Sequence, residues 1–220
     1  MRIRLALRYT ILLCGLFFMG LGISLTTKSN LGTTPISSLP YVLSMIAPLT
    51  FGEFTFLLSL FFVSVQIMLL RNTFPRLQYL QVLVGALFGA FVDLGMFLCS
   101  WINPHSYGHK VAVLLIGSIV LALGVYLEVI ANVIINPGEG AVRTIAKKTG
   151  IRFGSVKVLF DGTLTVIAVI LSLAAFGSIR GIREGTIISA LLVGSITNGF
   201  HFAVSRLWIT KRLLGFLSQP

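Results

Sequence analysis

The chain has 220 residues, of which 56% are hydrophobic and only 10% are charged, and its mean hydropathy is +0.98. Soluble globular domains carry about 25% charged residues, so this composition excludes that class. The formal net charge of +11 does not indicate a nucleic-acid-binding protein, because the basic residues flank apolar runs and form no basic, aromatic-rich face.

Six apolar runs follow one another along the chain, and each has close to the 20 residues or so that a helix needs to cross a bilayer core. They cover residues 9–25, 54–70, 77–100, 111–135, 156–176 and 185–208. Membrane strands are not expected, because barrel strands alternate in polarity and these runs are apolar all round. The sequence therefore predicts an all-α integral membrane protein, with six transmembrane helices in a single polytopic domain over residues 1–220.

The basic residues are unevenly divided between the two sides that such helices would define. With the N-terminus inside, the cytoplasmic ends hold Arg2, Arg4, Arg8, Arg71, Arg76, Arg143, Lys147, Lys148, Arg152, Arg206, Lys211 and Arg212. The opposite side receives only Lys28, Lys110, Arg180 and Arg183. Basic residues favour the cytoplasmic side of membrane proteins, so we expect both termini in the cytoplasm.

An internal repeat is visible when the sequence is shifted by 102 residues. The matched pairs are Gly15 with Gly117, Gly22 with Gly124, Asn30 with Asn132, Pro35 with Pro137, and Phe51-Gly52 with Phe153-Gly154. A shift of 105 pairs Gly89 and Asp93 with Gly194 and Asn198. Repeat one covers about 9–100 and repeat two about 111–208. Each would contain three spans, and an odd number makes the second repeat inverted relative to the first, as in many secondary transporters.

A short proline-led segment follows the first span of each repeat. These segments are TPISSLPYVLSMIAP at 34–48 and NPGEGAVRTIAKKTG at 136–150. Proline suits the first position of a helix, where its missing N–H leaves no bond unmade, and about a dozen residues are too few to span a bilayer. We expect one short helix in each repeat, either re-entrant or interfacial; the sequence leaves both open.

The starts of these short helices are the predicted substrate site. A helix N-terminus presents unpaired N–H groups and a positive dipole end, and Gly138 and Gly140 would let the backbone approach a ligand. Glu139 could line the site or cap its own helix. Asp93 and Asn198 lie at matching depths in the third and sixth spans. The full set of candidates is Asn30, Pro35, Ser37, Ser38, Asp93, Asn132, Pro137, Gly138, Glu139, Gly140 and Asn198.

Ionisable residues inside a span are costly and by default indicate a function. Glu128 lies in the fourth span, four residues before Asn132 and on the same helical face. Asp161 lies in the fifth span with Lys157 four residues earlier. We expect Glu128, Lys157 and Asp161 to take part in proton coupling, with a structural ion pair as the alternative for the last two.

Four stretches together resemble the YczE/YyaS/YitT family of bacterial membrane proteins, and in particular its YczE-type branch. They are GTTPISSLPYVLS, PGEGAVRTIAKKTG, FGSVKVLFD and IREGTIISALLVG, and the resemblance covers about residues 10–200. It implies a multi-pass protein of the bacterial inner membrane. It implies no substrate, reaction or catalytic residue.

The sequence thus favours a small secondary transporter or exporter of an unidentified solute, with a central site between inverted repeats. One alternative is a non-transporting membrane partner or accessory subunit, including the substrate-capture subunit of an importer; a weaker one is a channel, which would require a homodimer or a pore between the halves. No enzyme motif is present, and no cofactor, metal site or nucleic-acid partner is expected. The expected partners are the lipid bilayer and a small-molecule substrate.

Overall fold

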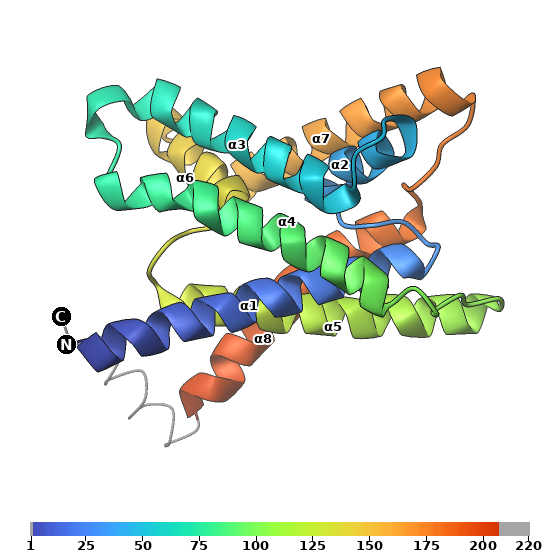
Figure 1. The fold of residues 1–220 in the computed structure, drawn as a ribbon, viewed down its shortest axis with the longest axis horizontal. Coiled ribbons are helices and arrows are strands. Elements are labelled where there is room, and N and C mark those ends of the chain that lie inside the picture. The colour runs from blue at the N-terminus through green and yellow to red at the C-terminus, as the bar shows by residue number, and fades with distance from the viewer. Residues whose placement is uncertain (1, 207–220) are drawn as a thin grey trace.

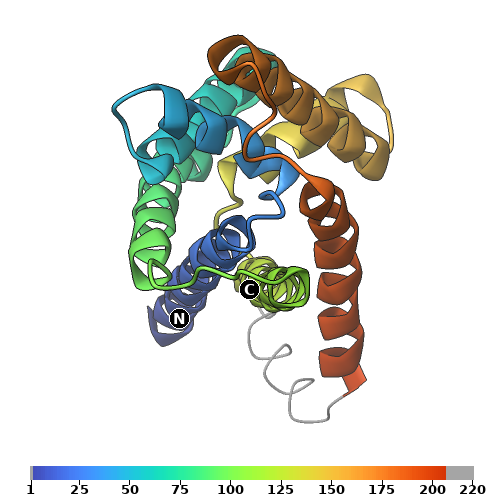
Figure 2. The same ribbon diagram turned by 90° about the vertical axis from the view of Figure 1, so that its right-hand side faces the viewer.

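The computed structural model describes residues 2–206, and every regular element in that part is a helix (Figure 1). Two layers are visible in Figure 2, with α1 and α5 in one and α3 and α7 in the other, while α4 and α8 lie on opposite sides. The α-helices are α1 (Arg2–Lys28), α2 (Pro35–Ile46), α3 (Phe51–Leu70), α4 (Gln81–Leu98), α5 (Tyr107–Ala131), α6 (Pro137–Thr149), α7 (Phe153–Phe176) and α8 (Glu184–Arg206). Two 3₁₀ turns, η1 (Arg71–Thr73) and η2 (Arg76–Leu80), join α3 to α4.

Five helical segments are long and apolar enough to cross a membrane. They are Leu5–Lys28, Phe51–Thr73, Arg76–Leu98, Tyr107–Ala131 and Phe153–Phe176. The predicted fourth run extended to residue 135, but its helix ends at Ala131 because Asn132 adopts the left-handed conformation with φ 45°. The predicted sixth run coincides with α8 as far as Arg206; residues 207–208 lie outside the described part, and the count of six spans stays a prediction.

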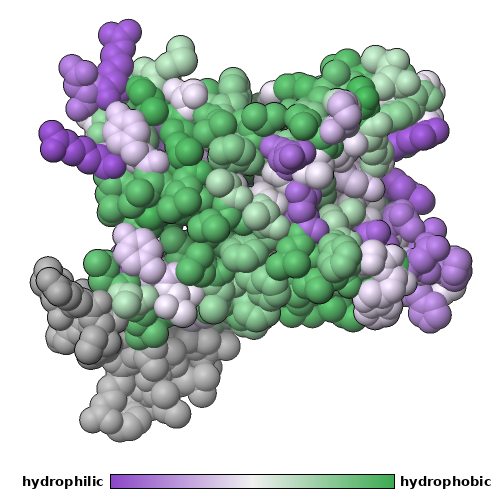
Figure 3. Space-filling view, in the orientation of Figure 1, coloured by the Kyte–Doolittle hydropathy of each residue, from purple (hydrophilic) through white to green (hydrophobic). Residues whose placement is uncertain are grey.

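The surface matches a protein surrounded by lipid. Figure 3 shows a broad hydrophobic area between two ends where hydrophilic residues gather. Large apolar side chains such as Phe61 on α3, Val158 on α7 and Leu191 on α8 are more than half exposed. Exposed apolar surface of this extent is unusual for soluble monomers, and in a bilayer it faces hydrocarbon at no cost.

Helices α1 and α5 form the centre of the fold and pack at backbone distance. The contacts join Gly15 to Gly124, Gly22 to Leu121 and Gly117 to Thr26. Residue numbers rise along α1 as they fall along α5, so the two helices are antiparallel. Small residues allow such close packing, which replaces the hydrophobic effect as the force between helices in lipid.

The boundaries of the structural elements recur at the shift found in the sequence. Helices α2 and α6 begin at Pro35 and Pro137, and α3 and α7 begin at Phe51 and Phe153. Asn30 and Asn132 both have a positive φ, 58° and 45°, which asparagine tolerates better than most residues. The bounds predicted for the two short helices are confirmed to within two residues.

The contacts between helices recur in the same way. Helix α2 packs on α7 as α6 packs on α3, and α4 packs on α1 as α8 packs on α5. One pair departs from this pattern within the described residues, because α3 packs closely on α4 whereas α7 and α8 have no comparable contact. The glycines show the difference directly: Gly52 lies against Gly89, while Gly154 and Gly194 face open space.

Candidate functional site

The N-terminal ends of α2 and α6 meet inside the bundle. In Figure 1 the chain turns back after α1 and after α5, so that α2 and α6 both begin near the middle and run toward opposite ends. A Cβ on Gly138 would lie 2.5 Å from Cδ1 of Ile36, which places the two helix starts in contact. This arrangement brings together the starts of both segments that the sequence singled out.

Local signals explain why α6 begins where it does. Asn136 is its N-cap and accepts a hydrogen bond from the Gly138 N–H at 3.1 Å through Oδ1. Pro137 occupies the first helical position, where its fixed φ suits a helix and its missing N–H costs nothing. Thr34 and Pro35 hold the corresponding positions of α2. Ser37 and Ser38 are buried there, and their hydroxyls pair locally with Thr34 and with the Pro35 carbonyl.

The Asn136 side chain is only half satisfied. It is 7% exposed, and its Nδ2 is the one buried side-chain nitrogen or oxygen without a hydrogen-bond partner in the described part of the chain. A buried unpaired donor costs about 1–3 kcal/mol. The junction of α2 and α6 therefore holds a free N–H donor where two positive dipole ends meet.

A half-open cavity of about 200 Å³ lies beside this junction. Its charged lining residues are Glu128 from α5 with Glu139 and Arg143 from α6. The remaining lining residues are Gln78, Val129, Asn132, Val133, Ile134 and Ile135. Glu128 and Asn132 both line the cavity, but they do not share a helical face as predicted, because α5 ends at Ala131 and Asn132 is its left-handed C-cap. Glu139 lines the cavity, while the cap of α6 that the sequence offered as its other role is made by Asn136.

Glu128 is the buried acid of this cavity, at 5% exposure. Its Oε1 accepts a hydrogen bond from the Asn136 backbone N–H at 2.6 Å, and this bond ties α5 to the start of α6. No cation lies within ion-pair distance of Glu128 in the described part of the chain. The cavity thus contains a buried carboxyl group without an ion-pair partner among the described residues.

Two glutamines that the sequence analysis did not select form a hydrogen-bonded pair next to the start of α6. Gln66 and Gln81 exchange side-chain hydrogen bonds of 2.9 and 3.2 Å, and Gln66 also donates to the Pro137 carbonyl at 3.1 Å. Gln81 donates to Gln78, which lines the cavity. Both amides are buried within or beside apolar runs, and a polar amide in an apolar run is the signal that could have found them.

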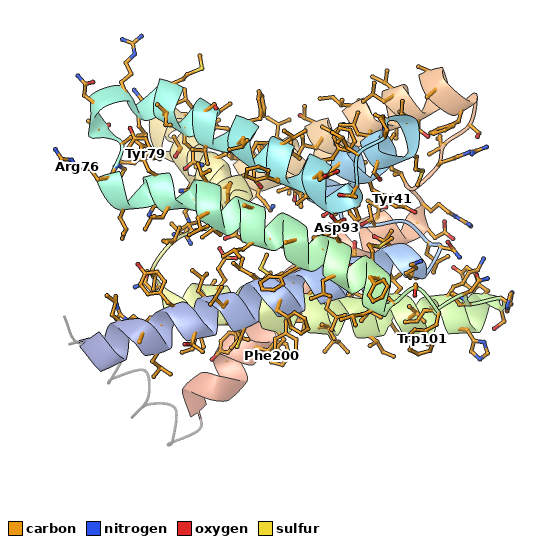
Figure 4. The ribbon with its side chains drawn as sticks, viewed as in Figure 1. Tyr41, Arg76, Tyr79, Asp93, Trp101 and Phe200 are labelled. Atoms are coloured by element: carbon orange, nitrogen blue, oxygen red, sulfur yellow. The ribbon has the colours of Figure 1, made fainter. Side chains whose placement is uncertain are left out.

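Asp93 accepts hydrogen bonds from the N-terminal end of α3 and not from the junction of α2 and α6. Its carboxylate accepts from Thr50 Oγ1 at 2.6 Å and from the Gly52 N–H at 2.7 Å, and Figure 4 shows it on α4 near the start of α3. Thr50 and Glu53 form a capping box at the same helix end. Asp93 therefore fastens α4 to the N-terminus of α3.

The other candidates are divided between the junction and the surface. The junction and its cavity bring together Pro35, Ser37, Ser38, Asn132, Pro137, Gly138, Glu139 and Gly140. Asn198 is exposed on α8, and the structure does not join it to Asp93. Asn30 is exposed as well, and its carbonyl accepts from Arg183 at 3.3 Å.

Lys157 and Asp161 form an ion pair of 3.0 Å on α7, with side chains 29% and 18% exposed. The ion pair that the sequence offered as the alternative role of these two residues is thus present, and their part in proton coupling stays a prediction. Pairs one turn apart on a helix with opposite charges attract one another, and the pair brings no unbalanced charge into the span.

This pair yields a prediction for stability. Lys157→Met should destabilise the protein by about 1–2 kcal/mol, between the cost of breaking a fully buried pair and that of breaking an exposed one. The double variant with Asp161→Leu should recover most of that loss, because no unpaired charge remains. Thermal unfolding of the single and double variants measures the coupling. A double variant that is less stable than Lys157→Met would contradict the purely structural role.

The amino-acid sequence is similar to a protein family and to a bacterial protein. A family described as a family of unknown function (DUF6198) matches residues 6–202. The uncharacterized protein YyaS of Bacillus subtilis (strain 168) is 29% identical over 206 residues, which cover 92% of this chain and 96% of YyaS. No solved structure matches the chain. The expected resemblance to the YyaS group is confirmed, whereas the narrower YczE-type assignment stays a prediction.

Proposed function

Since the chain belongs to the family of unknown function DUF6198, its activity must be inferred from its own chemistry, and we propose that it is a small secondary transporter of the bacterial inner membrane. In this proposal α1–α4 and α5–α8 are inverted repeats with three spans each, and both termini are cytoplasmic. The substrate binds where α2 and α6 begin. The protein is a transporter and not an enzyme.

The observation that carries the proposal is the meeting of two half-helices around Asn136, whose Nδ2 has no hydrogen-bond partner in the described part of the chain. Membrane transporters commonly bind substrates at such broken helices near the bilayer midplane. Non-helical backbone at that depth survives only where protein or a water-filled cavity satisfies it. Here the Asn136 N–H donates to Glu128, Gln66 donates to the Pro137 carbonyl at the start of α6, and the cavity borders the loop between α5 and α6.

Unequal packing of the two halves supports alternating access. The loop after α1 is closed by the start of α8, because the Gly185 N–H donates to the Leu31 carbonyl at 2.8 Å. The corresponding loop after α5 lines the half-open cavity instead. In one half this loop is bound by another helix, and in the other half it borders a cavity. Such a difference fits a transporter whose two halves exchange these arrangements as the site opens first to one side of the membrane and then to the other.

The first test is a thermal-stability screen of the purified full chain. The panel would contain small anions, amino acids, sulfonates, phosphonates and cations, each at two pH values. A solute at about 100 times its dissociation constant stabilises the folded state by about 2.7 kcal/mol. Solutes that stabilise the protein would then be tested for uptake into proteoliposomes.

The variant Asn136→Thr links such a hit to the junction. Threonine can still cap α6 and stands at the matching position of α2, but it lacks the Nδ2 donor. We expect the affinity for the solute to fall by up to about tenfold, the value of one charge-free hydrogen bond. At the same solute concentration the stabilisation then falls from about 2.7 to about 1.4 kcal/mol, and uptake at low solute concentration falls with the affinity. The control Asn72→Thr, at an exposed position between α3 and α4, should change neither. A silent panel with a folded protein and a stoichiometric co-purifying partner would contradict the proposal and favour an accessory subunit.

A further inference from the structure

The cavity beside Glu128 has the electrostatic character of a site for a cation. Two carboxyl groups, those of Glu128 and Glu139, and one guanidinium group, that of Arg143, line it. Glu139 and Arg143 are one turn apart on α6, where opposite charges attract one another. The cavity lies between the C-terminal end of α5 and the N-terminal end of α6, whose dipole ends have opposite signs. No ion pair joins Glu128 to another residue in the described part of the chain.

We propose that this cavity binds a small primary ammonium ion through the Glu128 carboxylate, and that a proton competes with the ammonium for the same carboxylate. This inference deepens the proposed function. Binding of the cation rests on the cavity alone, and only its transport across the membrane rests on the proposed function. The transported substrate would then be an organic amine, and the ion exchanged for it would be a proton.

The geometry around Glu128 leaves one oxygen for this ligand. Oε1 already accepts from the Asn136 N–H, whereas Oε2 has no hydrogen-bond or ion-pair partner within the described residues. An ammonium group donates three hydrogen bonds, and Gln78 and Asn132, whose side-chain amides each include an oxygen acceptor, line the same cavity. The Gln78 oxygen already accepts one hydrogen bond from Gln81 and retains a second lone pair. A buried carboxylate is stabilised when a cation supplies both charge and hydrogen bonds.

The size and donor set favour an ammonium over other cations. The volume of about 200 Å³ is below the roughly 300–1,000 Å³ typical of sites for drug-sized ligands. Hard metal ions take six or more oxygen ligands, often several of them carboxylates, and no group of three His, Cys, Asp or Glu side chains suited to a metal occurs among residues 2–206. A compact ammonium needs only the acceptors already present.

Competition with a proton follows from the charge of the site. A protonated Glu128 is neutral and no longer attracts the ammonium, so uptake of one proton releases one cation and the net charge of the cavity is unchanged. The charged groups that act on Glu128 are Glu139 and Arg143 from α6 and Lys157 from α7. Lys157 forms an ion pair with Asp161, so its ammonium group does not take the place of the ligand at Glu128. A carboxylate shared in this way couples the two ions one for one.

The experiment measures equilibrium binding of radiolabelled ethylamine to the purified full chain at constant ionic strength. We expect saturable binding that weakens at least about tenfold between about pH 8 and about pH 5, because burial disfavours the charged form of Glu128 and the carboxylate is lost as the pH falls. In weakly buffered acidic solution, a pH-sensitive dye should report protons released as ethylamine binds. Glu128→Gln should abolish binding, while Glu53→Gln, an exposed conservative control that keeps its capping box, should bind normally.

Each other outcome overturns a defined part of the inference. Binding that is independent of pH, with no proton release by the wild-type protein, would disprove the exchange even if Glu128→Gln fails to fold. Equal competition by sodium ions would disprove selectivity for an amine. If ethylamine does not bind but another solute gives Asn136-dependent uptake, this inference fails and the transporter proposal stands. If ethylamine binds at Glu128 without any flux, the cavity assignment stands and transport fails.

Discussion

Replacing Gly22 by valine should prevent the protein from folding, or destabilise it by about 3 kcal/mol or more, which is the upper range for overpacked interiors. Gly22 lies on α1 where it contacts the backbone of α5, and an added Cβ would come within 2.6 Å of the Leu121 Cα. Backbone atoms cannot rotate away as a flexible side chain can. Helices α1 and α5 would have to separate along the whole central interface. Fluorescence-detected size-exclusion chromatography and the thermal midpoint would report the loss.

The matched control for this change is Gly162→Val. Gly162 lies in α7, and no atom stands within 4 Å of the position that its Cβ would take. The same added volume therefore meets only the surrounding lipid, and we expect a midpoint close to that of the wild type. Similar behaviour of the two variants would mean that α1 and α5 are not in backbone contact.

The second large effect is expected for Asp93→Asn, which keeps the shape of the side chain but removes its charge. The carboxylate holds two donors from α3, Thr50 Oγ1 and the Gly52 N–H, and an amide can accept with only one of its two terminal atoms. Hydrogen bonds to charged groups contribute about 1.5–3 kcal/mol each, so we expect a loss of about 2–4 kcal/mol. Thermal unfolding of the purified variant measures it.

Asp93→Asn also separates two interpretations of this residue. If Asp93 is a structural clamp, the variant loses stability, and ligand binding by the remaining folded protein is normal. Glu53→Gln supplies the control, since glutamine maintains a capping box as well as glutamate does. Unchanged stability together with lost solute binding would instead restore Asp93 to the substrate site.

The short helices illustrate what local sequence signals can establish. Pro35 and Pro137 predicted their starts because proline at the first position and a capping residue before it act within a single helical turn. The left-handed Gly150 ends α6 by an equally local rule. The repeat was also readable, because identical residues at a fixed shift require no knowledge of contacts.

The roles of Asp93, Gln66 and Gln81 were not readable in this way. Asp93 finds its partners 41 and 43 residues away on α3, and Gln66 reaches Pro137 across 71 residues. The sequence shows that such polar side chains lie in apolar surroundings and must be paired. It does not show with what, because the pairing depends on which helices become neighbours.

The sequence by itself therefore determined the apolar, all-helical class of the chain and the starts of its short helices, and it singled out Glu128 as an acid in an apolar run, since each depends on composition, period or a local cap. Only the tertiary structure decided that α2 and α6 begin in contact, that Glu128 is buried with no ion-pair partner among the described residues, and that Asp93 belongs to the start of α3. The physical reason is the same in each case. Hydrogen bonds and charges act over a few ångströms, and the residues that share those distances here come from helices far apart in the chain.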